Sequence, residues 1–370
     1  MHELPIDDVL ADIISTLKNH NRVVLQASPG AGKTTKVPIA LLESLSSQSW
    51  FKNKQIIMLE PRRIAARNAA SRMAYLLNEK VGLTVGYQIR DDNCYSKKTQ
   101  ILVVTEGILT RKLQADPELS TMAFVIFDEF HERSLHADLS LALCLQSQQV
   151  LREDLKILVM SATLNTSAIS NLLDKAPVIQ SEGRSFPVDI RYIEKSLNQA
   201  ADVHLRHQNL ILKLLEIIKR VINEEKGHCL IFLPGLKEIT QLQSKLKEMC
   251  DLQSINNILI TPLHGQLSKQ QQDLAIKPTE NPFRKIVLAT NIAETSLTIE
   301  GVDCVIDSGL ERILQYNPSS AMDSLKTQFI SNDSATQRCG RAGRLSAGTC
   351  YRLWTKQQQQ RLLKHSAAEI

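Results

Sequence analysis

The feature of this sequence that most limits its possible folds is a series of short, unbroken apolar runs separated by stretches with helical spacing. A strand whose residues are all apolar is buried on both faces, as happens when helices cover both sides of a parallel sheet. The alternation therefore predicts an α/β fold with mostly parallel sheets flanked by helices. The first set of runs lies at Val23–Leu25, Ile56–Leu59, Ile101–Val104, Phe124–Phe127 and Ile157–Met160.

The series restarts after a gap, which predicts two domains. Residues 179–209 hold no strong strand run, so we place the boundary at 180/181, with domain 1 at 1–180 and domain 2 at 181–370. A chain of 370 residues is long enough for two domains. The second set of runs lies at Cys229–Leu233, Ile258–Thr261, Ile286–Ala289 and Cys304–Ile306, and helical spacing is found at Ala65–Leu77, Leu135–Leu151 and Leu210–Ile222.

Composition narrows the class of protein. Hydrophobic residues make up 43% of the chain and charged residues 22%, which is typical of a folded, soluble protein. A net charge of +5 permits a polyanionic partner without requiring one, because binding needs a local basic cluster. The seven cysteines are scattered without a CxxC pair, so we expect reduced thiols and neither zinc nor disulfides. The amino terminus lacks a signal-peptide pattern and no apolar run could cross a bilayer, so we expect a cytoplasmic protein.

The carboxyl end has the pattern of a helix that stops short. Residues 355–370 read TKQQQQRLLKHSAAEI and keep helical spacing to the last residue. We therefore expect this chain to be the core of a longer protein, interrupted within a helix.

A phosphate-binding loop follows the first apolar run. Residues 27–35 read ASPGAGKTT and match the phosphate-loop pattern, except that Ala27 replaces its first glycine. The glycines let backbone N–H groups turn toward phosphate oxygens, and the helix expected to open at Lys33 adds its partial positive charge. Lys33 is expected to reach the β- and γ-phosphates and Thr34 to ligate Mg²⁺. The expected nucleotide contacts in this loop are Ser28, Pro29, Gly30, Ala31, Gly32, Lys33, Thr34 and Thr35.

Two adjacent carboxylates end another apolar run. Phe124–Phe127 is followed by Asp128 and Glu129, and then by Phe130 and His131. Asp128 is placed to hold Mg²⁺, and Glu129 to orient and deprotonate an attacking water. Two acids at a strand end can also be a solvated turn, but the phosphate loop upstream favours the catalytic interpretation.

Five blocks of sequence occur in the order found in superfamily 2 helicases. They read ASPGAGKTT at 27–35, DEFH at 128–131, SAT at 161–163, ATNIAETSLTI at 289–299 and QRCGRAGR at 337–344. Together they resemble the DEAH/RHA branch, in particular its bacterial members with DEFH in place of DEAH. The resemblance covers residues 28–354. It implies two RecA-like domains in tandem, with ATP in the seam where they meet.

The resemblance implies roles for residues far from the phosphate loop. Gln337, Arg341 and Arg344 would reach from the second domain to the γ-phosphate, where the arginines neutralise transition-state charge. His131 would contact Gln337 and couple domain closure to hydrolysis.

Further contacts are implied by the same resemblance. Arg72 would stack on the adenine base, and Thr298 and Glu300 would contact the ribose. Because no aromatic residue is evident opposite Arg72, we expect loose nucleotide selectivity. Ser161 and Thr163 would link the ATP site to the nucleic-acid site.

The nucleic-acid contacts implied by the resemblance are polar and basic. Such side chains suit phosphate and sugar groups, which position a strand without reading its sequence. Aromatic residues form 4% of the chain and are not interleaved with basic ones, so stacking platforms are not expected. The turn at Gly86–Arg90 and four other segments supply the candidate residues, which are Arg62, Arg63, Arg90, Thr105, Arg111, Gly235, Thr290 and Asn291.

The sequence as a whole predicts an ATP-dependent RNA helicase that uses ATP and Mg²⁺, acts on single-stranded RNA and is a monomer without a membrane partner. The segment Leu310–Phe329 resembles the β-hairpin that DEAH-type proteins use as a wedge. The preference for RNA over DNA follows from the resemblance alone. The alternatives are an ATP-driven translocase or remodeller that does not unwind duplexes, a nucleic-acid binding module with an inactive motor, and a phosphate-loop kinase.

Overall fold

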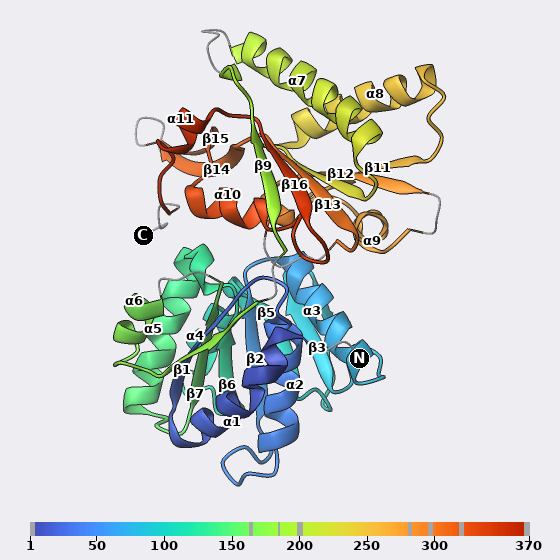
Figure 1. The fold of residues 1–370 in the computed structure, drawn as a ribbon. Coiled ribbons are helices and arrows are strands. Elements are labelled where there is room, and N and C mark those ends of the chain that lie inside the picture. Colours follow the sequence, from blue (N-terminus) through green and yellow to red (C-terminus); the bar gives the residue numbers. More distant parts are fainter. Residues whose placement is uncertain are drawn as a thin grey trace. The chain divides into compact units, whose positions relative to one another are not determined.

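The computed structural model describes residues 4–162, 166–183, 186–197, 203–279, 283–294, 299–317 and 322–365. The chain forms two compact units, with unit 1 extending to residue 184 and unit 2 running from 185 to 366. Figure 1 shows the elements of each unit.

Unit 1 is built on an eight-stranded sheet with the order β4-β3-β5-β2-β6-β7-β1-β8. Neighbouring strands are parallel, apart from the antiparallel pair β3 and β4. Parallel strands present all their carboxyl ends at one edge of the sheet, and open α/β sheets bind their ligands at that edge. The strands are β1 (Arg22–Ala27), β2 (Gln55–Glu60), β3 (Val85–Ile89), β4 (Asp92–Cys94), β5 (Ile101–Thr105), β6 (Met122–Phe127), β7 (Lys156–Ser161) and β8 (Val178–Ser181).

Helices cover both faces of this sheet, which explains the unbroken apolar runs in its central strands. In β6, Phe124 and Ile126 face a core shared with α1, α2 and α3, whereas Val125 and Phe127 face a core shared with α4, α5 and α6. Successive side chains of a strand alternate between faces, so both sets must be apolar. The helices are η1 (Pro5–Val9), α1 (Leu10–Asn19), α2 (Lys33–Leu45), α3 (Arg63–Leu76), α4 (Glu106–Ala115), η2 (Phe130–Glu132), α5 (Leu135–Val150) and α6 (Thr166–Leu172).

Unit 2 has a six-stranded, wholly parallel sheet with the order β11-β12-β10-β13-β16-β9, and a separate antiparallel hairpin of β14 and β15. One face of the sheet packs against α7 and α8. The strands are β9 (Val188–Tyr192), β10 (His228–Phe232), β11 (Ile258–Leu263), β12 (Arg284–Ala289), β13 (Val302–Asp307), β14 (Leu310–Asn317), β15 (Met322–Phe329) and β16 (Gly348–Arg352). The helices are α7 (Val203–Glu224), α8 (Leu236–Leu252), α9 (Lys269–Ile276), η4 (Asn291–Ala293), α10 (Asn332–Cys339) and α11 (Lys356–Gln359).

The predicted fold class is confirmed, since each apolar run lies in a strand and the main sheets are parallel. The hairpin expected within Leu310–Phe329 is also present.

Two expectations about strands are wrong. Gly86–Ile89 belongs to strand β3 and not to a turn; the turn begins at Arg90, because Asp91 adopts a left-handed conformation with φ 65°. The region 179–209 contains most of β8 and all of β9. Both are edge strands with partly exposed side chains, so they lack an apolar run.

The carboxyl-terminal helix is shorter than its spacing predicts. Within the residues described up to 365, α11 ends at Gln359 and turns follow it. Thr355 and Gln358 form a capping box, and the Gln359 amide oxygen accepts hydrogen bonds from Trp354 (2.8 Å) and Arg352 (2.9 Å). These contacts fix a single turn against the sheet.

Among the described residues, no helix is long and apolar enough to cross a membrane.

Phe124 provides a test of the unit 1 core. Its ring is fully buried and lies edge-on to Trp50 and Phe51, with centroid separations of 5.6 Å. We expect Phe124→Ala to lower the free energy of unfolding by about 3–5 kcal/mol, because it leaves a cavity. Urea unfolding measures the change. Tyr75→Ala, at a side chain that is 71% exposed, should change stability by less than about 0.5 kcal/mol; equal losses would contradict the assignment of Phe124 to the core.

Candidate functional site

The phosphate loop connects β1 to α2 at the carboxyl edge of the unit 1 sheet. Gly30 and Gly32 have φ values of 86° and 93°, a left-handed conformation that glycine adopts without strain. A Cβ atom on Gly32 would also lie 2.7 Å from the Leu4 side chain. The loop is supported from outside by η1, since Ile6 donates a backbone hydrogen bond to the Ala31 carbonyl (3.2 Å). The loop therefore has the form needed to direct N–H groups at an anion.

The residues predicted to act on the nucleotide phosphates meet in unit 1. The Lys33 ammonium lies 2.7 Å from a Glu129 carboxylate oxygen and 3.9 Å from Asp128. The Thr34 hydroxyl donates a hydrogen bond to Asp128. Lys33, Asp128 and Glu129 are all buried. The sheet thus brings the phosphate loop and the acidic pair together, although Lys33 and Glu129 are 96 positions apart in the sequence.

Glu129 is held in an unusual backbone conformation. Its φ of 50° and ψ of 35° are left-handed, which costs a non-glycine residue about 1–3 kcal/mol. Its N–H donates to Asp128 Oδ1 (2.8 Å), and the following Phe130 is buried against Phe127. This tight turn points both carboxyl groups toward Lys33.

His131 connects the acidic turn to the end of β7. Its Nδ1 lies 3.4 Å from Glu129 Oε2 and accepts a hydrogen bond from the backbone N–H of Ala162 (3.4 Å). Ala162 follows Ser161 in the SAT block, so this contact links two motifs within unit 1. Thr163 of that block lies outside the described residues.

A third carboxyl group, that of Glu60, lies in the same cluster and was missed by sequence reasoning. Glu60 ends β2, the neighbour of β6, and is fully buried. Among the described residues, no donor reaches either of its carboxyl oxygens. In the sequence, Glu60 is followed by Pro61 and two arginines, a pattern typical of a polar turn. Its position at the end of a buried strand, next to the strand that carries the acidic pair, is the feature that could have identified it.

Burial and charge compete in this cluster. Burial raises the pKa of Glu60 well above its ordinary value, and the neighbouring charges of Asp128 and Glu129 add to the increase. Burial also raises the pKa of Asp128, which the Lys33 charge only partly offsets. For Lys33, burial alone would lower the pKa, but the carboxylates of Glu129 and Asp128 outweigh it and raise the pKa. Without a ligand, Glu60 is therefore the carboxyl group most favoured to hold a proton.

The predicted nucleic-acid contacts of unit 1 lie on the other half of the same sheet edge. Arg62 and Arg63 follow β2, Thr105 ends β5 and Arg90 follows β3; these three strands are neighbours. Arg62 forms an ion pair with Glu132 (3.2 Å), whereas Arg63 and Arg90 are exposed. Arg111 is exposed on the second turn of α4. The edge thus carries the phosphate loop and the acidic pair after β1 and β6, and the basic residues after β2 and β3, with Glu60 at the end of β2 on the border between them.

The predicted adenosine contacts are only partly described. Arg72 is exposed on α3, and its guanidinium lies 5.3 Å from the centroid of the Tyr75 ring. An aromatic side chain therefore accompanies Arg72 on its own helix, which the sequence reasoning did not consider. Glu300 is exposed, and Thr298 lies outside the described residues.

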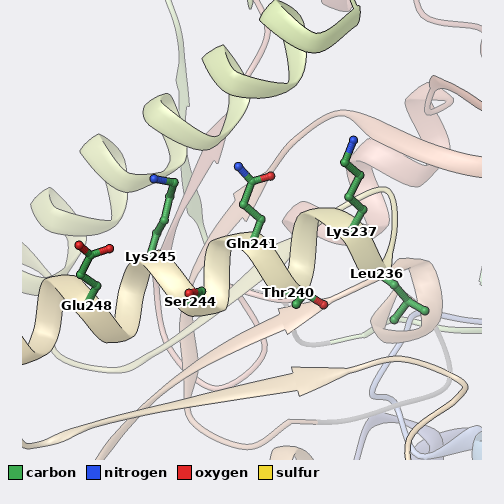
Figure 2. A pocket seen from close by; sticks show the side chains of 7 residues that line it. All are labelled: Leu236, Lys237, Thr240, Gln241, Ser244, Lys245 and Glu248. Atoms are coloured by element: carbon green, nitrogen blue, oxygen red, sulfur yellow. The ribbon is translucent and has the colours of Figure 1, made fainter.

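In unit 2, the predicted nucleic-acid residues follow neighbouring strands. Gly235 comes after β10 and is the N-cap of α8, while Thr290 and Asn291 follow β12. The exposed face of α8 that continues from Gly235 lines a groove of about 710 Å³, and in Figure 2 Lys237, Gln241 and Lys245 project from the same side of that helix.

The last motif lies on α10 and the turn after it. Gln337 is half-buried, and Arg341 is buried with its Nε donating to the Glu294 carbonyl (3.0 Å). Arg344 is half-buried. The adjacent Arg338, which sequence reasoning passed over, is also buried.

Comparison with known proteins finds a matching family for each unit. Residues 8–172 match the family described as DEAD/DEAH box helicase, and residues 210–346 match the helicase conserved C-terminal domain. The chain belongs to the DEAD/DEAH box helicase family. The chain is 46% identical over 370 residues to the ATP-dependent RNA helicase HrpB of Escherichia coli, of which it covers 44%. The crystal structure of the E. coli DEAH/RHA helicase HrpB superposes with a TM-score of 0.88 over 99% of this chain and 45% of that one.

More distant relatives carry related names. The chain is 40% identical over 359 residues to the ATP-dependent RNA helicase HrpA of Borreliella burgdorferi, covering 97% of this chain and 42% of that protein. It is 37% identical over 369 residues to the probable ATP-dependent RNA helicase DHX34 of Mus musculus, covering 99% of this chain and 31% of that protein. The chain thus spans less than half the length of these relatives, and its two units are RecA-like domains.

Glu60 makes the stability of the folded chain depend on pH. The pKa of the Glu60 carboxyl group is higher in the folded chain than in the unfolded chain. Its contribution to the free energy of unfolding is therefore fully present below the unfolded-state pKa, and it is lost as the pH rises through the folded-state pKa. We expect Glu60→Gln to unfold at a temperature higher than wild type by a few degrees, roughly, at pH 8, with little difference near pH 4. Thermal unfolding in EDTA measures this. The exposed Glu118→Gln is the control; the same pH profile in both variants would contradict the assignment.

Proposed function

We propose that this chain is the motor core of an ATP-dependent RNA helicase, which hydrolyses ATP in response to RNA and moves along and unwinds it. The observation that carries the proposal is the contact of Lys33, on the phosphate loop, with Glu129 of the acidic pair (2.7 Å). Phosphate binding and water activation require these groups together.

Each residue of the cluster has a distinct role in this proposal. Lys33 exchanges its contact with Glu129 for the β- and γ-phosphates, which frees that carboxylate to orient and deprotonate the attacking water. Arg341 and Arg344 contact the γ-phosphate in the ATP-bound protein and neutralise charge in the transition state. The position of these arginines in the QRCGRAGR block supports that role.

The described residues fit Mg²⁺ as the partner of ATP. The Thr34 hydroxyl and the Asp128 carboxylate contact each other at the phosphate loop, and both are hard oxygen ligands of the kind that Mg²⁺ prefers. When bound, Mg²⁺ would offset negative charge on the phosphates and on this carboxylate.

The nucleic acid is proposed to run over the basic residues of the sheet edge. Arg62, Arg63, Arg90 and Thr105 follow neighbouring strands and suit contacts to successive phosphates. The names of the relatives support RNA as the strand. In unit 2, Gly235 and the turn at Thr290 and Asn291 would hold the same backbone.

A translocase that does not separate strands is the second candidate. The chain covers 44% of E. coli HrpB, so groups that assist unwinding in the relatives are candidates to lie in the unmatched part. The antiparallel hairpin β14–β15 favours unwinding, since it is a two-stranded ribbon separate from the main sheet and nearly all of β15 is exposed.

Glu129→Gln tests the catalytic proposal. We expect ATP binding to persist and RNA-stimulated turnover to fall by roughly 10²- to 10⁴-fold, because the amide cannot accept the proton of the water. Turnover is measured with and without single-stranded RNA and DNA. The control is Glu43→Gln, an exposed carboxylate on α2; near-normal turnover of Glu129→Gln would remove this residue from its role.

The hairpin gives a separate test of strand separation. We expect replacement of residues 316–323 by an Asn-Gly turn to abolish displacement of a 3′-tailed RNA duplex while RNA-stimulated ATP hydrolysis stays within about twofold, because the paired segment up to Gln315 and Ser324 is retained. A shortened protein that still separates strands would contradict the wedge. A wild-type chain with stimulated turnover and no displacement would favour the translocase.

A further inference from the structure

Arg338 is a buried arginine on α10 that has no part in the proposed function. Its side chain is 1% exposed, and the guanidinium lies 4.9 Å from the centroid of the Phe232 ring. Arg338 stands between Gln337 and Arg341 in the last motif but points into unit 2. A guanidinium is retained in such a place only where it is paired and hydrogen-bonded.

Three separate segments of unit 2 meet on this one side chain. Arg338 Nε donates to the Glu294 carboxylate (2.8 Å), and Nη1 donates to Asp307 Oδ1 (3.0 Å) and to the backbone carbonyl of Leu310 (3.3 Å). Glu294 follows η4, Asp307 ends β13 and Leu310 begins β14 of the hairpin. A planar guanidinium has donors in fixed directions, so it fixes the relative positions of these segments.

The same glutamate also holds a proposed catalytic arginine. The Glu294 side chain binds Arg338, while its backbone carbonyl accepts the hydrogen bond from Arg341 Nε (3.0 Å). The turn that ends at Glu294 begins with Thr290 as its N-cap and contains Asn291, the two residues proposed to hold the nucleic-acid backbone. Thus a short turn carries nucleic-acid contacts at one end and an anchor for Arg341 at the other.

The hydrogen bonds that Arg338 makes to Glu294 and Asp307 are buried, so their geometry cannot change without a large cost in free energy. Asp307 is fully buried, and it also accepts a hydrogen bond from the backbone N–H of Gly309 (2.9 Å). Although burial by itself would lower the pKa of Arg338, the charges of Asp307 and Glu294 raise it, so the guanidinium stays charged. A displacement of any partner would leave a buried charge unpaired, which is strongly unfavourable.

We propose that Arg338 is a positioning residue that couples the nucleic-acid turn and the base of the hairpin to the arginine that acts on ATP. A strand held at Thr290 and Asn291 moves Glu294, and Glu294 carries Arg341 with it, because Arg338 ties all three segments together. Stimulation of ATP hydrolysis by RNA depends on this tie. The inference rests on the proposed function and adds a residue and a route for coupling to it.

A purely structural role for Arg338 would give a different experimental result. If Arg338 only stabilised the unit 2 core, its substitution would lower the unfolding temperature and leave the ratio of RNA-stimulated to basal turnover unchanged. The buried Arg284 provides that comparison. It lies at the opposite, amino-terminal edge of the same sheet and donates to the backbone carbonyls of Val221 and Ile222 at 3.2 and 3.3 Å, far along the strands from the motif residues.

The experiment compares Arg338→Lys with Arg284→Lys. Lysine keeps the charge and loses the fork of donors, so it leaves one carboxylate poorly held. For Arg338→Lys we expect the RNA-stimulated to basal ratio to fall by at least about fivefold, the lower end of typical coupling between sites, while RNA affinity without nucleotide changes by less than about twofold. Arg284→Lys should keep the wild-type ratio even where it lowers the unfolding temperature.

A second variant protects the test against misfolding. Glu294→Gln preserves side-chain size and the backbone carbonyl that holds Arg341, but replaces the charged acceptor of Arg338 by a neutral one. It should reduce the ratio in the same direction and by a smaller factor. Wild-type ratios in Arg338→Lys and Glu294→Gln would overturn the coupling role. Wild-type protein without any RNA stimulation would overturn the proposed function itself, and the inference with it.

Discussion

The chemistry of unit 1 depends on one buried ion pair, that of Lys33 with Glu129. Removing an ammonium group from water is strongly unfavourable unless carboxylates lie within a few ångströms. Here the phosphate loop supplies the cation and the ends of β6 and β2 supply Asp128, Glu129 and Glu60. The cluster carries more acids than bases, so it is matched to a ligand that brings positive charge near Asp128 and phosphates near Lys33. The groups that pair with one another in this cluster are those that a nucleotide would engage.

Much of this arrangement could be predicted from the sequence because parallel strands end at one edge. Val23–Leu25 and Phe124–Phe127 are unbroken apolar runs, and both are buried on two faces. Once such runs are assigned to one parallel sheet, the groups that follow them must lie near one another. The contact of Lys33 with Glu129 follows from that rule, whereas its distance and the left-handed turn at Glu129 do not.

The strand and the residues that were not predicted from the sequence were missed for related physical reasons. The edge strand β9 has none of its five side chains fully buried, so no apolar run marks it. Glu60 and Arg338 are charged residues inside the protein, and residue type alone places such groups on the surface. Their burial becomes evident only when distant parts of the chain are brought together, which places Glu60 beside Asp128 and pairs Arg338 with Glu294 and Asp307.

The direction of the strands has a practical consequence at the opposite edge of each sheet. The connections that enter the strands there, such as 46–54 before β2, 151–155 before β7 and 225–227 before β10, contain none of the motif residues. The motif residues of each unit thus leave the opposite edge of its sheet free, and exposed side chains of those connections are suitable attachment points. Fluorophores, affinity tags or surface tethers attached there would lie away from the motif residues.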